Sequence, residues 1–182
     1  MNRGGYSVRH GFVYKRGCVH LNKKQEIQAA LHAVKDPEIP SVSIEELGML
    51  YDIDIDEARV VVKLTPTFVG CPALDIISAN VKKAIVEQVP WVESVDVVYI
   101  YDINWSTERI SPDGREKLKE YGIAPPPLNY KEGQPWTVEC PYCGSPYTSI
   151  ENIFGPAACR SILYCKSCRN PFEAMKPVVA RK

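Results

Sequence analysis

Residues 60–77 read VVVKLTPTFVGCPALDII, and this stretch joins a strand pattern to a helix pattern. Its first part is rich in β-branched residues, which favour strands, and apolar residues recur at helical spacing after Pro72. Gly70, Cys71 and Pro72 separate the two patterns, and we expect Pro72 at the first position of a helix over 72–88, where its missing N–H costs nothing. The buried stripe of that helix should contain Leu74, Ile77, Val81, Ala84 and Ile85.

The segments around this unit predict a small α+β domain. LYDIDI and ARVVVKLT flank Asp56-Glu57 and should form a hairpin, and ESVDVVYIYD supplies a third strand. A helix over 22–34 follows from apolar residues on one face, with Asn22 as its N-cap. We therefore predict a three-stranded mixed sheet covered by the helices at 22–34 and 72–88.

Shorter motifs in the same region predict a loop, a helical turn and a third helix. DPEIP, at 36–40, contains two prolines and predicts an extended loop, and SIEELGML predicts a short helical turn. SPDGREKLKEYG predicts a helix that Ser111 caps, Pro112 starts and Gly122 ends.

These patterns divide the chain into five predicted parts. The first 24 residues carry six Lys or Arg and no acid, and because no apolar segment follows, they do not form a secretory signal. After the α+β domain, three consecutive prolines stiffen a linker. The predicted parts are a disordered basic leader at 1–21, the α+β domain at 22–122, the linker at 123–136, a cysteine-rich module at 137–177 and a tail at 178–182.

The composition indicates a protein of the reducing cytoplasm. Lys plus Arg and Asp plus Glu both number 22, so no global field recruits nucleic acid or an anionic membrane. No apolar run approaches the roughly 18 residues of a membrane span. Seven cysteines without a secretory signal favour metal ligation over disulfides.

The cysteine-rich module contains two CxxC pairs, CPYC and CKSC, separated by 21 residues. Two such turns close a tetrahedron around zinc, with Zn–S distances of about 2.3 Å. The module has few large apolar side chains, so metal ligation should supply its folding free energy. A rubredoxin-like iron site uses the same donor set and stays open as an alternative. The predicted ligands of a structural zinc ion are Cys140, Cys143, Cys165 and Cys168.

A fifth thiol, Cys159, lies six residues before Cys165. One interpretation is a buried small apolar side chain, and the other is an exchange or transfer ligand.

The module lacks the sequence signature of a nucleic-acid-binding ribbon. A dedicated binder carries a basic stripe with exposed aromatic residues. Here the basic residues Arg160, Lys166, Arg169 and Lys176 are offset by Glu139, Glu151 and Glu173.

Cys71 is predicted to lie after a strand and at the start of a helix. A helix N-terminus lowers the pKa of a thiol, so we expect an exposed and partly ionised side chain. Asp36 and Glu38 lie in a loop at the end of other elements and could approach it. A Cys–His hydrolase is disfavoured because all three histidines, at 10, 20 and 32, lie in the leader and first helix. A metal- or cluster-binding thiolate and an inert structural cysteine both remain open.

Three segments carry a resemblance to a known family. DPEIPSVSIEELGMLYDIDI, VVVKLTPTFVGCPALDII and VYIYDINWSTERISPDGREKLKEYGIAPP resemble the small domain of iron–sulfur cluster assembly factors of the SufT and cytosolic assembly type. With the tail CPYCGSPYTSIENIFGPAACRSILYCKSCRNPFEAMKP, the chain resembles the PaaD family, encoded with the bacterial phenylacetyl-CoA 1,2-epoxidase, over residues from about 25 to 177.

The resemblance implies an accessory role rather than catalysis. The chain would help to mature an epoxidase, delivering iron or an iron–sulfur cluster to the oxygenase or to its iron–sulfur reductase, together with the iron–sulfur assembly machinery. It offers neither the Glu-x-x-His motif of di-iron proteins nor a GxGxxG loop. The rival hypothesis is a structural zinc-ribbon adaptor that docks the oxygenase without handling iron.

The resemblance also implies site residues. The family's cysteine after the second strand falls on Cys71, and its acidic loop falls on Asp36 and Glu38. These three are the candidate residues for transient handling of iron or a cluster, while zinc is the expected structural metal.

Overall fold

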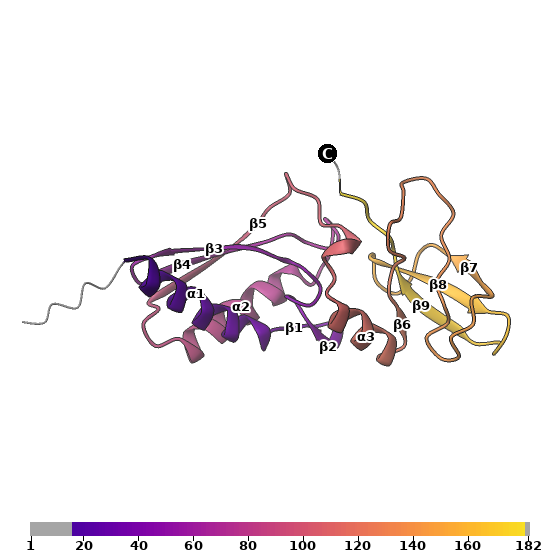
Figure 1. Ribbon diagram of the computed structural model, residues 1–182, viewed down its shortest axis with the longest axis horizontal. Coiled ribbons are helices and arrows are strands. Elements are labelled where there is room, and N and C mark those ends of the chain that lie inside the picture. The colour runs from indigo at the N-terminus through magenta and orange to yellow at the C-terminus, as the bar shows by residue number, and fades with distance from the viewer. Residues whose placement is uncertain (1–15, 181–182) are drawn as a thin grey trace, which may run out of the picture.

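The computed structural model describes residues 16–180. Figure 1 shows an elongated molecule, with two long helices and a three-stranded sheet toward one end and a separate sheet at the other. The α+β class predicted from the sequence is confirmed.

The first sheet consists of β3 (Leu50–Asp56), β4 (Arg59–Leu64) and β5 (Ser94–Tyr99) in the order β3-β4-β5. β3 and β4 form the predicted antiparallel hairpin, and Glu57 turns the chain with φ 50°. β5 pairs with β4 in parallel, so the sheet is mixed as predicted. The central strand β4 supplies three fully buried side chains to the core, Val60, Val62 and Leu64.

Two helices, α1 (Arg16–His32) and α2 (Leu74–Gln88), lie together on one side of this sheet (Figure 1). The predicted apolar face of the first helix is buried through Ile27, Ala30 and Leu31. Its predicted start is wrong, because α1 runs through Asn22, which is therefore not an N-cap. Residues 16–21, predicted to be disordered leader, belong to α1, and residues 1–15 lie outside the described part of the chain.

The DPEIP loop is more ordered than predicted. Its residues take part in a two-stranded ribbon of β1 (Lys35–Asp36) and β2 (Ile39–Ser43). The Asp36 carboxylate accepts hydrogen bonds from the backbone N–H groups of Glu38 and Ile39, at 2.8 and 3.0 Å, and so closes the turn between these strands.

The tight turn that follows β2 in the chain contacts α3 (Pro112–Glu120). The Ser43 N–H donates to the Glu46 carboxylate, and the Glu46 N–H donates to the Ser43 hydroxyl. This reciprocal pattern is that of a capping box. The Glu46 carboxylate also pairs with Lys117 of α3. Gly48 ends the turn at φ 69°, where a Cβ would lie 2.3 Å from the Arg109 carbonyl oxygen, so only glycine fits.

The predicted start of α3 is confirmed, and Gly122 follows its C-cap, Tyr121, at φ 89°. Ser111 accepts a hydrogen bond from the Gly114 N–H, and Pro112 is the first helical residue. A short 3₁₀ helix, η1 (Thr107–Arg109), precedes it.

The C-terminal sheet has the order β6-β9-β8-β7. Its strands are β6 (Ile123–Ala124), β7 (Thr148–Asn152), β8 (Arg160–Cys165) and β9 (Pro171–Met175). β6 pairs in parallel with β9, so the first two residues predicted as linker belong to this sheet instead. The division of the chain at 123 therefore differs from the structure: the chain enters the ribbon directly after α3.

The ribbon has its own small core but also contacts the main one. Leu163, Phe172 and Ala174 are buried in the ribbon with two of its cysteines. Met175 and Ile123 are instead buried in the core of the α+β domain. In addition, the Thr107 N–H donates to the Val178 carbonyl at 3.0 Å. The ribbon is therefore docked on the α+β domain.

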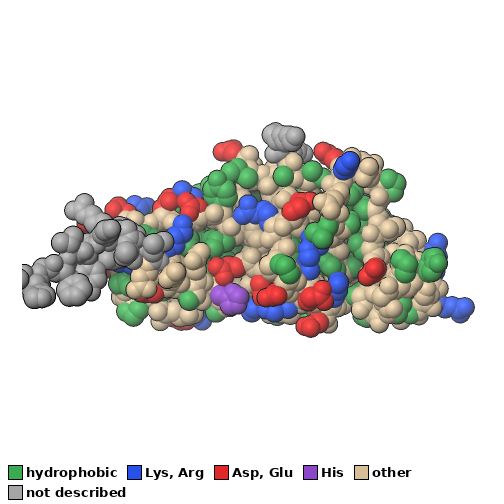
Figure 2. All heavy atoms as spheres, viewed as in Figure 1, with side chains coloured by type: hydrophobic (Ala, Val, Ile, Leu, Met, Phe, Trp, Pro, Cys, Tyr) green, Lys and Arg blue, Asp and Glu red, His purple; other side chains and the backbone are tan. Residues whose placement is uncertain are grey.

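Surface properties agree with the balanced composition. Among the described residues, no helix combines the length and the apolar character needed to traverse a bilayer. On the face shown in Figure 2, acidic and basic side chains are intermixed rather than gathered by sign.

Glu46 gives the fold a testable pH dependence. Burial alone raises its pKa, but hydrogen bonds from Lys117 and Ser43 outweigh this and lower the pKa to about 2 from an ordinary value of 4.5. Because the folded-state pKa is depressed, its stabilisation is present above about pH 4.5 and is lost as the pH falls through about 2. Glu46→Gln should lower the free energy of unfolding by about 2 kcal/mol at neutral pH, in urea titrations.

The difference in free energy of unfolding between wild type and Glu46→Gln should become smaller as the pH is lowered toward 2. Glu116→Gln is the matched control, because Glu116 makes only an exposed pair with Lys119 and its loss should cost under about 0.5 kcal/mol. A Glu46→Gln deficit that is equally large at pH 3 and pH 7 would contradict this account.

Candidate metal-handling sites

Four cysteines of the ribbon meet in one cluster. The ligand atoms of Cys140, Cys143, Cys165 and Cys168 all lie within 4.8 Å of one another. The Sγ atoms of Cys140 and Cys168 are 3.7 Å apart, and those of Cys143 and Cys165 are 3.6 Å apart. A tetrahedron with metal–sulfur distances of about 2.3 Å places its sulfurs about 3.8 Å apart, whereas a disulfide needs about 2.05 Å. The donor set therefore fits one metal ion.

Local backbone geometry builds this cluster. The carbonyl of Cys140 accepts from the Gly144 N–H, and the carbonyl of Cys165 accepts from the Arg169 N–H, both at 2.8 Å. Gly144 and Arg169 each adopt a left-handed conformation, with φ 69° and 59°, which turns the chain after each pair. Backbone N–H groups of Cys168 and Ser167 donate to the sulfur of Cys165 and lower its pKa to about 6. The turn thus favours a thiolate where a metal ligand is needed.

Single Cys→Ser changes at the four ligands should release the metal and unfold the ribbon. The ribbon core is small, so metal ligation must supply much of its stability. Metal content by mass spectrometry and limited proteolysis would measure both effects. Cys159→Ala is the matched control, and should keep the metal of the four-cysteine cluster and lose at most about 1 kcal/mol. Full metal content in all four serine variants would contradict the assignment.

Cys71 differs from that cluster in its surroundings. The structure places it after β4 and before α2, in the order predicted. The predicted helix start is wrong by two residues, because α2 begins at Leu74 with Ala73 as its N-cap and Pro72 lies outside it. The Cys71 side chain is half-buried against the core of the α+β domain.

The expected low pKa of Cys71 is also wrong. Burial raises the pKa of the thiol, and although the Ala73 N–H opposes this, the Glu38 and Asp36 carboxylates raise it further. The start of α2 lies too far along the chain for its N–H groups to offset the effects of burial and of the two carboxylates on this pKa. Without a metal, Cys71 is a neutral thiol at physiological pH.

Cys71 faces a pocket of about 190 Å³ that two parts of the chain build together. Glu38, Phe68 and Pro72 line it from the α+β domain. The segment from Pro156 to Cys159, between β7 and β8 of the ribbon, lines it from the other side. The structure therefore places Glu38 at the pocket of Cys71, an approach that the sequence analysis considered, and adds Cys159, which that analysis singled out separately.

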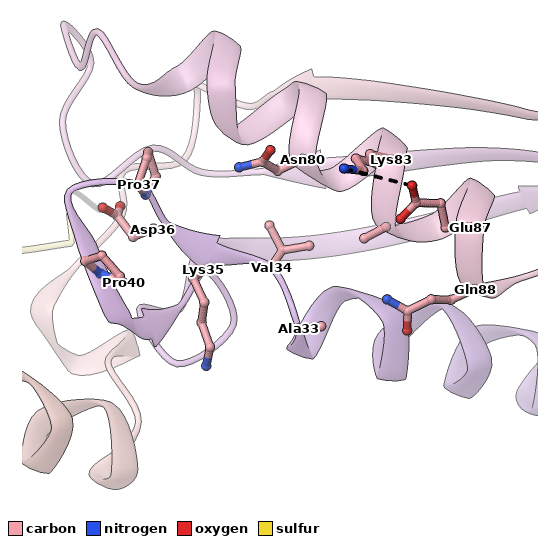
Figure 3. Close-up of a pocket in the computed structure, with 11 residues that line it drawn as sticks. Ala33, Val34, Lys35, Asp36, Pro37, Pro40, Asn80, Lys83, Glu87 and Gln88 are labelled. Carbon is pink, nitrogen blue, oxygen red and sulfur yellow. Dashed lines mark ion pairs between the residues drawn. The ribbon is translucent and has the colours of Figure 1, made fainter.

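Asp36 has a different position from Glu38. Its carboxylate is buried and committed to the turn between β1 and β2. It borders a separate hollow of about 340 Å³ between that turn and α2, shown in Figure 3 with the Lys83–Glu87 ion pair on the opposite wall. Asp36 therefore shapes the loop that presents Glu38, and contributes to the pocket of Cys71 only through its charge.

Sequence reasoning missed the role of Arg160. Its guanidinium is almost fully buried and donates to Glu173 at 2.6 Å within the ribbon. It also reaches the backbone carbonyl of Glu38 at 3.3 Å and its carboxylate at 3.5 Å. No local pattern could have revealed this contact, because 122 positions separate the two residues.

Comparison with protein families divides the chain at nearly the same place as the structure. A family described as iron-sulfur cluster assembly protein matches residues 24–97. A family described as PaaD zinc beta ribbon domain matches residues 124–176.

Individual relatives agree with the two family matches. The chain is 38% identical over 152 residues to the D subunit of the Escherichia coli (strain K12) "Putative 1,2-phenylacetyl-CoA epoxidase", covering 83% of this chain and 91% of that protein. It is 37% identical over 89 residues to the Bacillus subtilis (strain 168) Fe-S protein maturation auxiliary factor YitW, covering 48% of this chain and 85% of that protein. Among solved structures, a domain of unknown function from Bacillus anthracis superposes with a TM-score of 0.54 at 33% identity, over 57% of this chain and 97% of that one.

Proposed function

The chain belongs to the family of 1,2-phenylacetyl-CoA epoxidase D subunits, with the PaaD zinc ribbon, and we propose that it is a non-catalytic maturation factor for such an oxygenase system. Its cargo would be iron or an iron–sulfur cluster. Its recipient would be the oxygenase or the iron–sulfur reductase that feeds it, and the cargo would come from the iron–sulfur assembly machinery. The names of two relatives, one from an epoxidase and one an iron–sulfur maturation factor, support the two halves of this proposal.

The observation that carries the proposal is the contrast between the two thiol sites. The four ribbon cysteines form a closed donor set with no open coordination position, which suits a structural zinc ion. Cys71 is instead half-buried and borders a pocket beside the Glu38 carboxylate. A ligand that must release its cargo needs few protein donors and access for the recipient. Cys71 would be that working thiol, and Glu38 an accessory oxygen donor, with Asp36 holding the loop.

A second candidate function is that of a structural adaptor, and exposed aromatic side chains of the ribbon favour it. Tyr142, Tyr147 and Phe154 are 59%, 71% and 74% exposed. Exposed aromatic residues are enriched where proteins dock. On this view the zinc ribbon would bind the oxygenase, and Cys71 would be a packing residue.

Co-expression with the oxygenase and its reductase separates the two functions. Cys71→Ser should leave folding and ribbon zinc unchanged but reduce partner activity and partner iron content at least about tenfold, since a direct ligand is worth no less than an outer-shell partner. Val69→Ser is the matched control, an exposed change in the same loop that should have no effect. Full partner activity with Cys71→Ser would favour the adaptor.

A further inference from the structure

The pocket that contains Cys71 is incomplete without the ribbon. Its second wall is the segment Pro156–Cys159, which the sequence places 85 positions and more from Cys71. The second thiol at the pocket, Cys159, lies on this wall. A docked ribbon thus converts a site with one sulfur donor into a site with two.

Backbone contacts fix the position of Cys159. The carbonyl of Cys159 accepts from the Lys176 N–H, and the preceding carbonyl of Ala158 accepts from the Lys176 ammonium, both at 2.9 Å. The Gly155 N–H donates back to the Arg160 carbonyl at 3.0 Å, and a Cβ at Gly155 would lie only 2.8 Å from that backbone. The segment is therefore a closed loop whose shape requires glycine, and it presents Cys159 at a set place.

Arg160, the next residue, joins this loop to the acidic turn across the pocket. Its ion pair with Glu173 is short, at 2.6 Å, whereas its contact with the Glu38 carboxylate is long, at 3.5 Å. A contact of 3.5 Å is at the limit of a hydrogen bond. Arg160 therefore holds the Glu38 carboxylate at the pocket through a long ion pair.

The simpler explanation, that Cys159 is a packing residue, fits the structure less well. Among the described residues, Cys159 belongs to neither hydrophobic core, although it is partly shielded from solvent. Burial raises the pKa of its thiol to about 11, with Arg160 opposing and the Glu38, Asp36 and Cys71 charges adding to the effect.

We propose that Cys71 and Cys159 are paired thiolate ligands of one iron site, built across the two modules, with the Glu38 carboxylate at the same pocket. This inference rests on the proposed function, and it deepens it by making the ribbon part of the cargo site rather than a docking module alone. The shared chemistry is iron held by two thiolates, either as a single ferrous ion or as one iron of a sulfide-bridged cluster.

Loading and release are ligand exchanges without electron transfer. On loading, each thiol releases its proton to solvent as its iron–sulfur bond forms. On release, both bonds break as thiolates or carboxylates of the recipient bind the iron, and the two thiols take up protons again. Two protein sulfurs leave coordination positions free for the recipient, unlike the closed set in the ribbon.

Anaerobic loading of the full-length, zinc-containing chain tests the pairing. One arm adds ferrous iron alone, and the other adds ferrous iron with sulfide, so that the two cargo forms are distinguished by sulfide content and visible absorption. Iron and zinc per chain are measured after gel filtration. Wild type should retain iron in at least one arm, and both Cys71→Ser and Cys159→Ser should reduce iron affinity at least about tenfold with ribbon zinc unchanged.

Two further variants keep the test interpretable. Ala158→Ser changes the neighbouring wall residue without removing a donor and should load as wild type does. Cys159→Ala guards against a folding defect peculiar to serine, with circular dichroism and zinc content as checks.

The outcomes separate this inference from the proposed function. If Cys71→Ser loses iron while Cys159→Ser and Cys159→Ala load normally, the paired site is overturned and Cys71 alone remains the working thiol. If Cys159 variants lose iron and Cys71→Ser does not, the paired site is also overturned. If wild type retains no iron in either arm, both the pairing and the role in iron handling fall.

Discussion

The guanidinium of Arg160 is the constraint on which the arrangement of the two modules depends. It is 8% exposed, and a buried charge must be neutralised where it lies. Glu173 does this from within the ribbon, and the loop of Glu38 does it from the α+β domain. The hydrogen bond of this guanidinium to the Glu38 carbonyl, at 3.3 Å, ties the ribbon to its neighbour in one orientation. The burial of Met175 and Ile123 in the main core strengthens the same docking.

This docking explains how one chain can contain two thiol sites with opposite chemistry. The ribbon cluster uses local turns, closed by Gly144 and Arg169, to gather four sulfurs from neighbouring strands. The pocket of Cys71 depends on distant parts of the chain, so its donors are few and its geometry follows the docking. The ribbon cluster is suited to retaining its metal, and the pocket of Cys71 is suited to transferring one. On the proposed function, the folding free energy and the handling of iron would thus be carried by different cysteines.

Much of the fold could be predicted from local patterns. The hairpin at Glu57, the parallel strand after α2, the cap at Ser111 and the four ribbon ligands all follow from residues close in sequence. The errors have physical causes as well. The first helix continues upstream of Asn22, because a residue type that often caps helices can also lie inside one. The predicted linker begins with β6, because the pairing of β6 with β9 is a long-range contact that local sequence does not show. For the same reason, the sequence could name Cys71, Glu38 and Cys159 but could not place them around one pocket.

The central claim, that thiols from the two modules face one pocket, can be measured without any iron. Dibromobimane becomes strongly fluorescent only when both of its arms have alkylated thiols, and the metal expected in the ribbon would protect its four cysteines. Treatment of the zinc-containing chain at mildly alkaline pH, followed by peptide mapping, should give a fluorescent cross-link between the peptides of Cys71 and Cys159. Cys71→Ser or Cys159→Ser should abolish it. Single attachments at Cys71 with no bridge to Cys159 would contradict the account.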